Sequence, residues 1–133
     1  MKKAVIFDMY GVLLRNFLIM EREHTDVTEL LEKLKARGLK LYLLSNIFVR
    51  DSNYFKNKYP FLTRFDKLYF SSDTGFIKPD PRAYELVLKE NNVKPEDCIF
   101  FDDTPRNVEA ARALGIEAYV FESADMVREK LGI

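Results

Sequence analysis

Several residue types are scarce or missing from this chain of 133 residues, which has one cysteine, one histidine, and neither tryptophan nor glutamine. A single cysteine excludes an internal disulfide and is typical of a reducing compartment. Cys98 begins the apolar run Cys98-Ile99-Phe100-Phe101, which favours a small buried side chain over a reactive thiol. The lack of glutamine and tryptophan, together with many lysines and glutamates, points to a thermophilic source.

An excess of charge of one sign is also missing, because 21 lysines and arginines balance 21 aspartates and glutamates. Without a broad basic surface, nucleic acid is not expected as the main partner. No apolar run approaches the roughly 20 residues that span a bilayer, and only four apolar residues follow Met1-Lys2-Lys3, too few for a signal peptide. We therefore expect a cytoplasmic protein without a membrane partner.

Short apolar runs alternate with amphipathic segments, a pattern typical of a parallel α/β sheet. The length and the apolar content of 47% predict one domain over residues 1–133. The predicted strands cover residues 4–8, 39–44, 67–71, 99–102 and 118–121. Predicted helices begin after the N-cap residues Asp26, Asp80, Thr104 and Ser123, and a further helix covers residues 50–59. This order predicts a three-layer, Rossmann-like α/β sandwich around a mainly parallel five-stranded sheet.

Polar side chains stand at the carboxyl ends of the predicted strands. Asp8 ends the first strand, Ser45 follows the second, and Asp102 with Asp103 ends the fourth. In an open parallel sheet these ends meet at one edge, where ligands bind. Helix N-termini arrive at the same edge and favour an anion. The sequence therefore predicts a site that combines acids, a hydroxyl group and main-chain N–H groups.

Four motifs in order resemble those of the haloacid dehalogenase superfamily, and the resemblance covers nearly the whole chain. They are Asp8-x-Tyr10-Gly11, Leu44-Ser45-Asn46, Lys78-Pro79-Asp80-Pro81 and Asp102-Asp103, and residues 107–115 resemble the helix that follows the acidic pair in the family. The resemblance implies a hydrolase in which Asp8 attacks the substrate and forms a covalent aspartyl intermediate. Lys78 would offset the negative charge of the reacting group.

The resemblance also implies a phosphorylated substrate and a bound Mg²⁺. Ser45 Oγ and the main-chain N–H groups of Gly11 and Asn46 would hold the non-bridging oxygens of the phosphate. Asp8, the main-chain carbonyl group of Tyr10, and Asp103 would bind the metal directly, and Asp102 would do so through a water molecule.

Tyr10 departs from the pattern of the family's phosphatases, which carry there an aspartate that protonates the leaving oxygen and then activates water. A phenol with a pKa of about 10 is a poor general base at neutral pH. The segment Asp-x-Tyr-Gly and the later Tyr84 resemble the 2-haloacid dehalogenases, whose halide leaving group needs no proton. The pair Asp102-Asp103 does not, because two acids without a cation would repel a carboxylate substrate.

Three functions therefore remain open: a slow Mg²⁺-dependent phosphohydrolase, a non-catalytic binding or scaffold protein, and a metal-independent dehalogenase.

The cap domain that superfamily members insert between these motifs is missing from the sequence, because core elements fill both intervals. Only a small flap, residues 14–25, remains near the expected site. Its apolar run, residues 17–20, either packs under the flap or is covered by a second subunit in a homodimer. Arg15 could replace the halide-binding arginine of a cap, although a solvated side chain is the simpler interpretation. His24 has no ligand-type neighbours and is interpreted as a solvated or capping residue.

Overall fold

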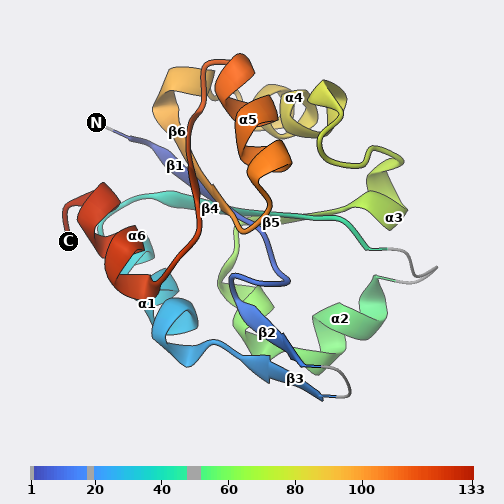
Figure 1. The fold of residues 1–133 in the computed structure, drawn as a ribbon, viewed down its shortest axis with the longest axis vertical. Coiled ribbons are helices and arrows are strands. Elements are labelled where there is room, and N and C mark those ends of the chain that lie inside the picture. Colours follow the sequence, from blue (N-terminus) through green and yellow to red (C-terminus); the bar gives the residue numbers. More distant parts are fainter. Residues whose placement is uncertain (1, 18–19, 48–51) are drawn as a thin grey trace.

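The computed structural model describes residues 2–17, 20–47 and 52–133. Five parallel strands form one sheet in the order β5-β4-β1-β6-β7. Their bounds are β1 Ala4–Phe7, β4 Lys40–Ser45, β5 Lys67–Phe70, β6 Cys98–Asp102 and β7 Glu117–Val120. Figure 1 shows α4 (Pro81–Glu90) and α5 (Pro105–Ala113) on one face of the sheet, with α1 (Thr25–Ala36) and α6 (Ala124–Leu131) on the other. The predicted α/β fold with a parallel five-stranded sheet is confirmed.

Shorter elements complete the described chain. The helices α2 (Asn53–Lys58) and α3 (Ser71–Thr74) and the 3₁₀ turns η1 (Pro60–Arg64) and η2 (Pro95–Asp97) connect the strands. A separate antiparallel pair, β2 (Leu14–Phe17) and β3 (Met20–Glu23), lies between β1 and α1. No helix in the described part of the chain is both long and apolar enough to cross a membrane.

The central strand β1 explains why its sequence does not alternate between apolar and polar residues. It pairs with β4 on one side and β6 on the other, and all four of its side chains are fully buried. Val5 and Phe7 belong to the core on one face, whereas Ala4 and Ile6 belong to the core on the other. Apolar side chains are therefore needed on both faces, as expected for a parallel sheet covered by helices on both sides.

Cys98 is buried at the start of β6, as predicted. Burial, which disfavours the charged thiolate, raises its pKa to about 11. The thiol is therefore an inert part of the core under ordinary conditions.

The predicted N-caps have mixed outcomes. Asp80 accepts a hydrogen bond from the Arg82 N–H group at 2.9 Å, and Ser123 Oγ accepts one from the Met126 N–H group at 3.1 Å, so both caps are confirmed. Thr104 occupies the N-cap position of α5, but its side chain makes no capping hydrogen bond.

The predicted capping box at Asp26 is wrong, because the N-cap residue of α1 is His24, two residues earlier. His24 is held at this position by its main-chain N–H group, which donates to the Leu13 carbonyl oxygen at 2.7 Å. Its ring nitrogen Nδ1 donates to the Val12 carbonyl oxygen at 3.1 Å, and the ring packs edge-on against Phe121. The only histidine of the chain thus joins the flap to the core. It occupies the N-cap position, but its side chain makes no capping hydrogen bond, so the expectation of a solvated or capping side chain is corrected.

The flap is the β2–β3 hairpin, in which Leu14 pairs with Glu23. Residues 18–19 and the side chains of residues 15–21 lie outside what the structure describes. The predictions about the apolar run at 17–20, Arg15 and a homodimer therefore stay predictions.

Candidate active site

A buried lysine bonded to two aspartates forms the centre of the site. Lys78 Nζ donates to Asp8 Oδ1 at 2.9 Å, to Asp102 Oδ2 at 2.8 Å and to the Leu44 carbonyl oxygen at 2.6 Å. Asp8 follows β1, Asp102 ends β6 and Leu44 lies near the end of β4, so three neighbouring strands converge on one ammonium group. All three protons of the ammonium group have an acceptor, which is what a buried charge requires.

The site has more negative than positive charge. Asp8, Asp102 and Asp103 can place one carboxylate oxygen each within 4.8 Å of the others, with Lys78 beside them. Burial raises the pKa of Asp8 to about 7, even though Lys78 acts in the opposite direction. Partial burial of the carboxyl group and the nearby Asp102 carboxylate also raise the pKa of Asp103. A further cation would therefore be bound favourably here.

Asp102 is held by a second set of contacts. Its Oδ1 accepts a hydrogen bond from the Thr104 N–H group at 2.8 Å, and its Oδ2 accepts one from Asn107 Nδ2 at 3.1 Å. Asn107, in the first turn of α5, was not among the predicted site residues. Its position one helical turn after the acidic pair is the signal that could have identified it, because the start of the helix lies beside the strand end.

Tyr84 contacts Asn107 from the protein interior. The side chain is fully buried, its ring packs edge-on against Phe100, and its hydroxyl group donates to the Asn107 carbonyl oxygen at 2.8 Å. It is not among the residues that line the cavity above Asp8. Its resemblance to a dehalogenase tyrosine therefore has a structural explanation, which is the attachment of α4 to α5.

Gly11 makes room for Asp103. Its φ of +86° lies in the left-handed region, and a Cβ atom there would stand 2.1 Å from Asp103 Oδ2. Its N–H group donates to the Leu14 carbonyl oxygen at 2.8 Å, which corrects the prediction that this N–H group holds a substrate oxygen. The glycine instead lets the metal-binding candidate Asp103 approach the turn after β1.

We expect Gly11→Ala to displace the Asp103 carboxylate and to weaken Mg²⁺ binding at least about tenfold, since ligands to a metal must be held in place. The added methyl group meets a side chain as well as a strained backbone, so thermal stability should fall too, by about 1 kcal/mol or more. Isothermal titration with Mg²⁺ measures the first effect. Gly38→Ala is a matched control, because Gly38 has a similar φ of +85° and open space around it. Equal Mg²⁺ affinity in both variants would contradict this role.

Ser45 is the other unusual group. It is 1% exposed, and among the described residues its Oγ is the buried side-chain polar atom without a hydrogen-bond partner. A buried hydroxyl group without a partner is costly unless a ligand completes it. Its position at the end of β4 agrees with the predicted contact to an oxygen of the substrate.

An open cavity of about 390 Å³ lies above this centre. Its lining residues are Asp8, Tyr10, Gly11, Asn46, Lys78, Asp103, Thr104 and Asn107. Tyr10 is half-buried in the wall, with its ring edge-on to Phe55 at 6.2 Å between centroids. The structure thus places the predicted residues Asp8, Tyr10, Gly11, Asn46, Lys78 and Asp103 around one cavity, with Ser45 and Asp102 buried beside it.

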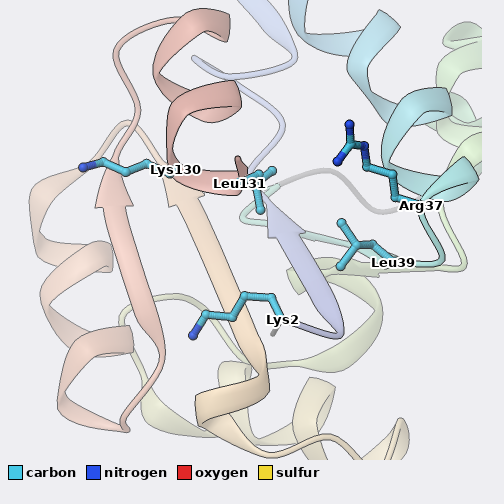
Figure 2. Close-up of a pocket in the computed structure, with 5 residues that line it drawn as sticks. All are labelled: Lys2, Arg37, Leu39, Lys130 and Leu131. Carbon is cyan, nitrogen blue, oxygen red and sulfur yellow. The ribbon is translucent and has the colours of Figure 1, made fainter. Parts of the chain in front are cut away.

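A second cavity, of about 440 Å³, lies at the opposite edge of the sheet and is lined by Lys2, Arg37, Leu39, Lys130 and Leu131. Figure 2 shows that the charged ends of its lysines and arginine point in different directions rather than toward one point. Lys2 is already paired with Glu117 at 3.2 Å. The described residues that line this second cavity therefore offer no convergent set of charged groups.

Comparison with known proteins decides the family. The family described as haloacid dehalogenase-like hydrolase matches residues 16–115, which include Ser45, Lys78 and the pair Asp102-Asp103. The chain belongs to this family. The family match agrees with the resemblance that the motifs predicted, while Asp8, Tyr10 and Gly11 lie before the matched residues.

Several curated relatives are phosphatases by name, among them two that are 35% identical to this chain over the matched residues. A phosphorylated carbohydrates phosphatase of Thermotoga maritima is 35% identical over 103 residues, which are 77% of this chain and 48% of the relative. The sesquiterpene phosphatase astK of Aspergillus oryzae is 35% identical over 95 residues, 71% of this chain and 48% of the relative. The chain thus spans about half the length of these relatives.

Solved structures show the same fold. A HAD family enzyme from Bacteroides thetaiotaomicron, determined as a complex with magnesium and inorganic phosphate, superposes with a TM-score of 0.78 at 19% identity. The match covers 91% of this chain and 94% of that one.

Proposed function

We propose that this protein is a Mg²⁺-dependent phosphohydrolase that acts through an aspartyl-phosphate on Asp8. The observation that carries the proposal is the contact between the Asp8 carboxylate and the buried Lys78 ammonium group, beside a buried Ser45 hydroxyl group that lacks a partner. A nucleophile, a positive charge and an open hydrogen-bonding group are what phosphoryl transfer requires at one point. The phosphatase names of the relatives support the same chemistry.

The residues at the site fit Mg²⁺. The candidate ligand atoms are all oxygens, from Asp8, Asp103, Asp102 and the main-chain carbonyl group of Tyr10, and Mg²⁺ prefers oxygen ligands. Both oxygens of Asp102 already accept hydrogen bonds, which agrees with its proposed contact through a water molecule. When bound, the ion supplies positive charge that offsets the repulsion between these carboxylates and a phosphate dianion.

The residues of the chain then divide the work. A carboxylate oxygen of Asp8 forms a bond to phosphorus while the bond from phosphorus to the leaving oxygen breaks. Lys78 Nζ stays beside the attacking carboxylate and balances negative charge, and Ser45 Oγ with the Asn46 N–H group receives the non-bridging oxygens. Water hydrolyses the aspartyl-phosphate in the second step. Tyr10 occupies the position of the general acid and base, and a phenol is weak in both roles at neutral pH. Protonation of the leaving oxygen and removal of a proton from the attacking water therefore proceed with little help.

A dehalogenase is less well supported. Its two motivations were Tyr10 and Tyr84, and the Tyr84 hydroxyl group is used in the contact with Asn107. The three carboxylates beside the cavity would also repel a 2-haloacid. We therefore favour phosphate esters as substrates.

The test is a panel of phosphate monoesters and acetyl phosphate, assayed for phosphate release with Mg²⁺ and with EDTA. We expect hydrolysis that EDTA abolishes and that added Mg²⁺ restores. 2-Haloacids in the same panel should release no halide. Absence of phosphate release from every compound, or halide release that persists in EDTA, would reject the proposal.

A further inference from the structure

We propose that Asn46 is a positioning residue whose side-chain amide fixes Lys78 in place and does not bind the substrate. Asn46 Nδ2 donates to the Lys78 carbonyl oxygen at 2.9 Å, and the Lys78 main-chain N–H group donates to Asn46 Oδ1, also at 2.9 Å. Both the nitrogen and the oxygen of the Asn46 amide are therefore bonded to the main chain of Lys78. The side chain reproduces the pair of hydrogen bonds that two opposite residues exchange in a β-ladder.

Lys78 needs such support because of where it lies. It belongs to the connection between α3 and α4, outside any strand. Across the described residues, its main-chain N–H and carbonyl groups have hydrogen bonds to Asn46 alone. The lysine side chain is long and flexible, yet its ammonium group must meet three acceptors at 2.6–2.9 Å. A shift of the Lys78 main chain would therefore move the ammonium group away from Asp8.

Asn46 is itself firmly anchored. It follows Ser45, the last residue of β4. The next residue, Ile47, donates its N–H group to Ser71 Oγ at 2.8 Å and accepts a hydrogen bond from the same oxygen at 2.8 Å. Ser71 is buried at the start of α3. Reciprocal pairs of hydrogen bonds thus join the segment after β4 to both α3 and Lys78, so the sheet determines where the lysine stands.

The consequence for catalysis rests on the proposed function. If Lys78 balances charge that develops in the transition state, loss of the Asn46 contacts lowers kcat and leaves KM nearly unchanged. If the amide instead bound the substrate, its loss would raise KM. The two roles also differ in their dependence on Lys78, because a positioning residue has no effect once the positioned group is removed.

The kinetic test is a double-mutant cycle of Asn46→Ala and Lys78→Met, with p-nitrophenyl phosphate and Mg²⁺. Misplacement of a catalytic group by about 1 Å can cost on the order of 10²-fold, so we expect Asn46→Ala to lower kcat by about 10- to 100-fold. KM should change by less than about threefold, and in the Lys78→Met background the same substitution should cost less than about threefold. An equal loss in both backgrounds, or a higher KM with unchanged kcat, would overturn the proposal.

Two further variants sharpen the cycle. Asn46→Asp keeps the acceptor for the Lys78 N–H group but sets a carboxylate oxygen against the Lys78 carbonyl oxygen in place of the donor, so its loss of kcat should be at least as large as that of Asn46→Ala. The matched control is Asn91→Ala, since the Asn91 amide also makes two hydrogen bonds, to Tyr69 at 2.9 Å and Val87 at 2.8 Å, away from the cavity. It should leave kcat unchanged.

A second measurement needs no turnover. Acetylation of each lysine by a soluble acylating reagent, followed by mass spectrometry, reports how accessible Lys78 is. We expect Lys78 to react at least about tenfold faster in Asn46→Ala than in wild type or in Asn91→Ala, because the ammonium group loses its fixed position. An unchanged rate would overturn the proposal. A raised rate in a protein that hydrolyses no phosphate ester would refute the proposed function and leave the role of Asn46 standing.

Discussion

Asp8→Asn should abolish phosphate-ester hydrolysis, with a loss of at least about 10³-fold in kcat, because an amide cannot form the aspartyl-phosphate. The substitution keeps the shape of the side chain, and the amide oxygen can still accept the hydrogen bond that Lys78 Nζ now makes at 2.9 Å. The geometry around the cavity is therefore preserved while the nucleophile is lost. Phosphate release from p-nitrophenyl phosphate, measured with saturating Mg²⁺, checks the result.

Thermal unfolding shows whether this loss arises from unfolding. The pKa of Asp8 is raised from 3.8 to about 7 by burial, so the folded chain binds the proton more tightly than the unfolded chain. The stability that protonated Asp8 contributes at low pH is therefore lost as the pH rises from about 4 to about 7. At pH 8 without metal, Asp8→Asn should thus unfold at the same temperature as wild type or above it. An active Asp8→Asn protein would refute the role of Asp8 as the nucleophile.

Tyr10→Asp should raise kcat at least about tenfold, since general acid–base assistance typically contributes about 10²–10⁴-fold. The side chain at this position lines the cavity beside Asp8, where a carboxyl group could protonate the leaving oxygen and then accept a proton from water. The gain should be largest for alkyl phosphates, because their leaving oxygens are the most basic. Steady-state assays with aryl and alkyl phosphates measure the difference.

Tyr10→Phe is the matched control for this gain. It keeps the ring that packs edge-on against Phe55 and removes only the hydroxyl group. A phenol with a pKa of about 10 contributes little as a base at neutral pH, so Tyr10→Phe should hydrolyse esters at nearly the wild-type rate. A large loss of kcat in Tyr10→Phe, or no gain of kcat in Tyr10→Asp, would contradict the inference that Tyr10 limits turnover.

The sheet could be predicted from the sequence because its strands are buried on both faces. Apolar runs such as Ala4–Phe7 have no alternative placement in a chain of this size, and each is followed by a polar residue that marks the strand end. Asp8, Ser45 and Asp102 each stand at the carboxyl end of a strand, and parallel strands bring these ends together, so the location of the site could be predicted as well. Asp80-Pro81 likewise defines the start of α4 by local chemistry alone.

Contacts between distant segments could not be predicted in the same way. The start of α1 depends on hydrogen bonds from His24 to Leu13 and Val12, which outweigh the capping pattern at Asp26. The N–H group of Gly11 is directed to Leu14 by the turn after β1, whereas a motif shows only that a glycine is there. The amide of Asn46 bonds to Lys78, 32 residues further along the chain, and sequence spacing over such a separation does not indicate a contact.

The most direct test of the central claim is detection of the phosphoryl group on Asp8. The protein is mixed with Mg²⁺ and acetyl phosphate, quenched in acid within the first turnovers, digested and analysed by mass spectrometry. Because Tyr10 gives the second step little help, the account predicts that the peptide carrying Asp8 gains one phosphoryl group in wild type, less of it in Tyr10→Asp, and none in Asp8→Asn. Substrate turnover without any phosphorylated Asp8, or equal labelling of Asp8→Asn, would contradict it.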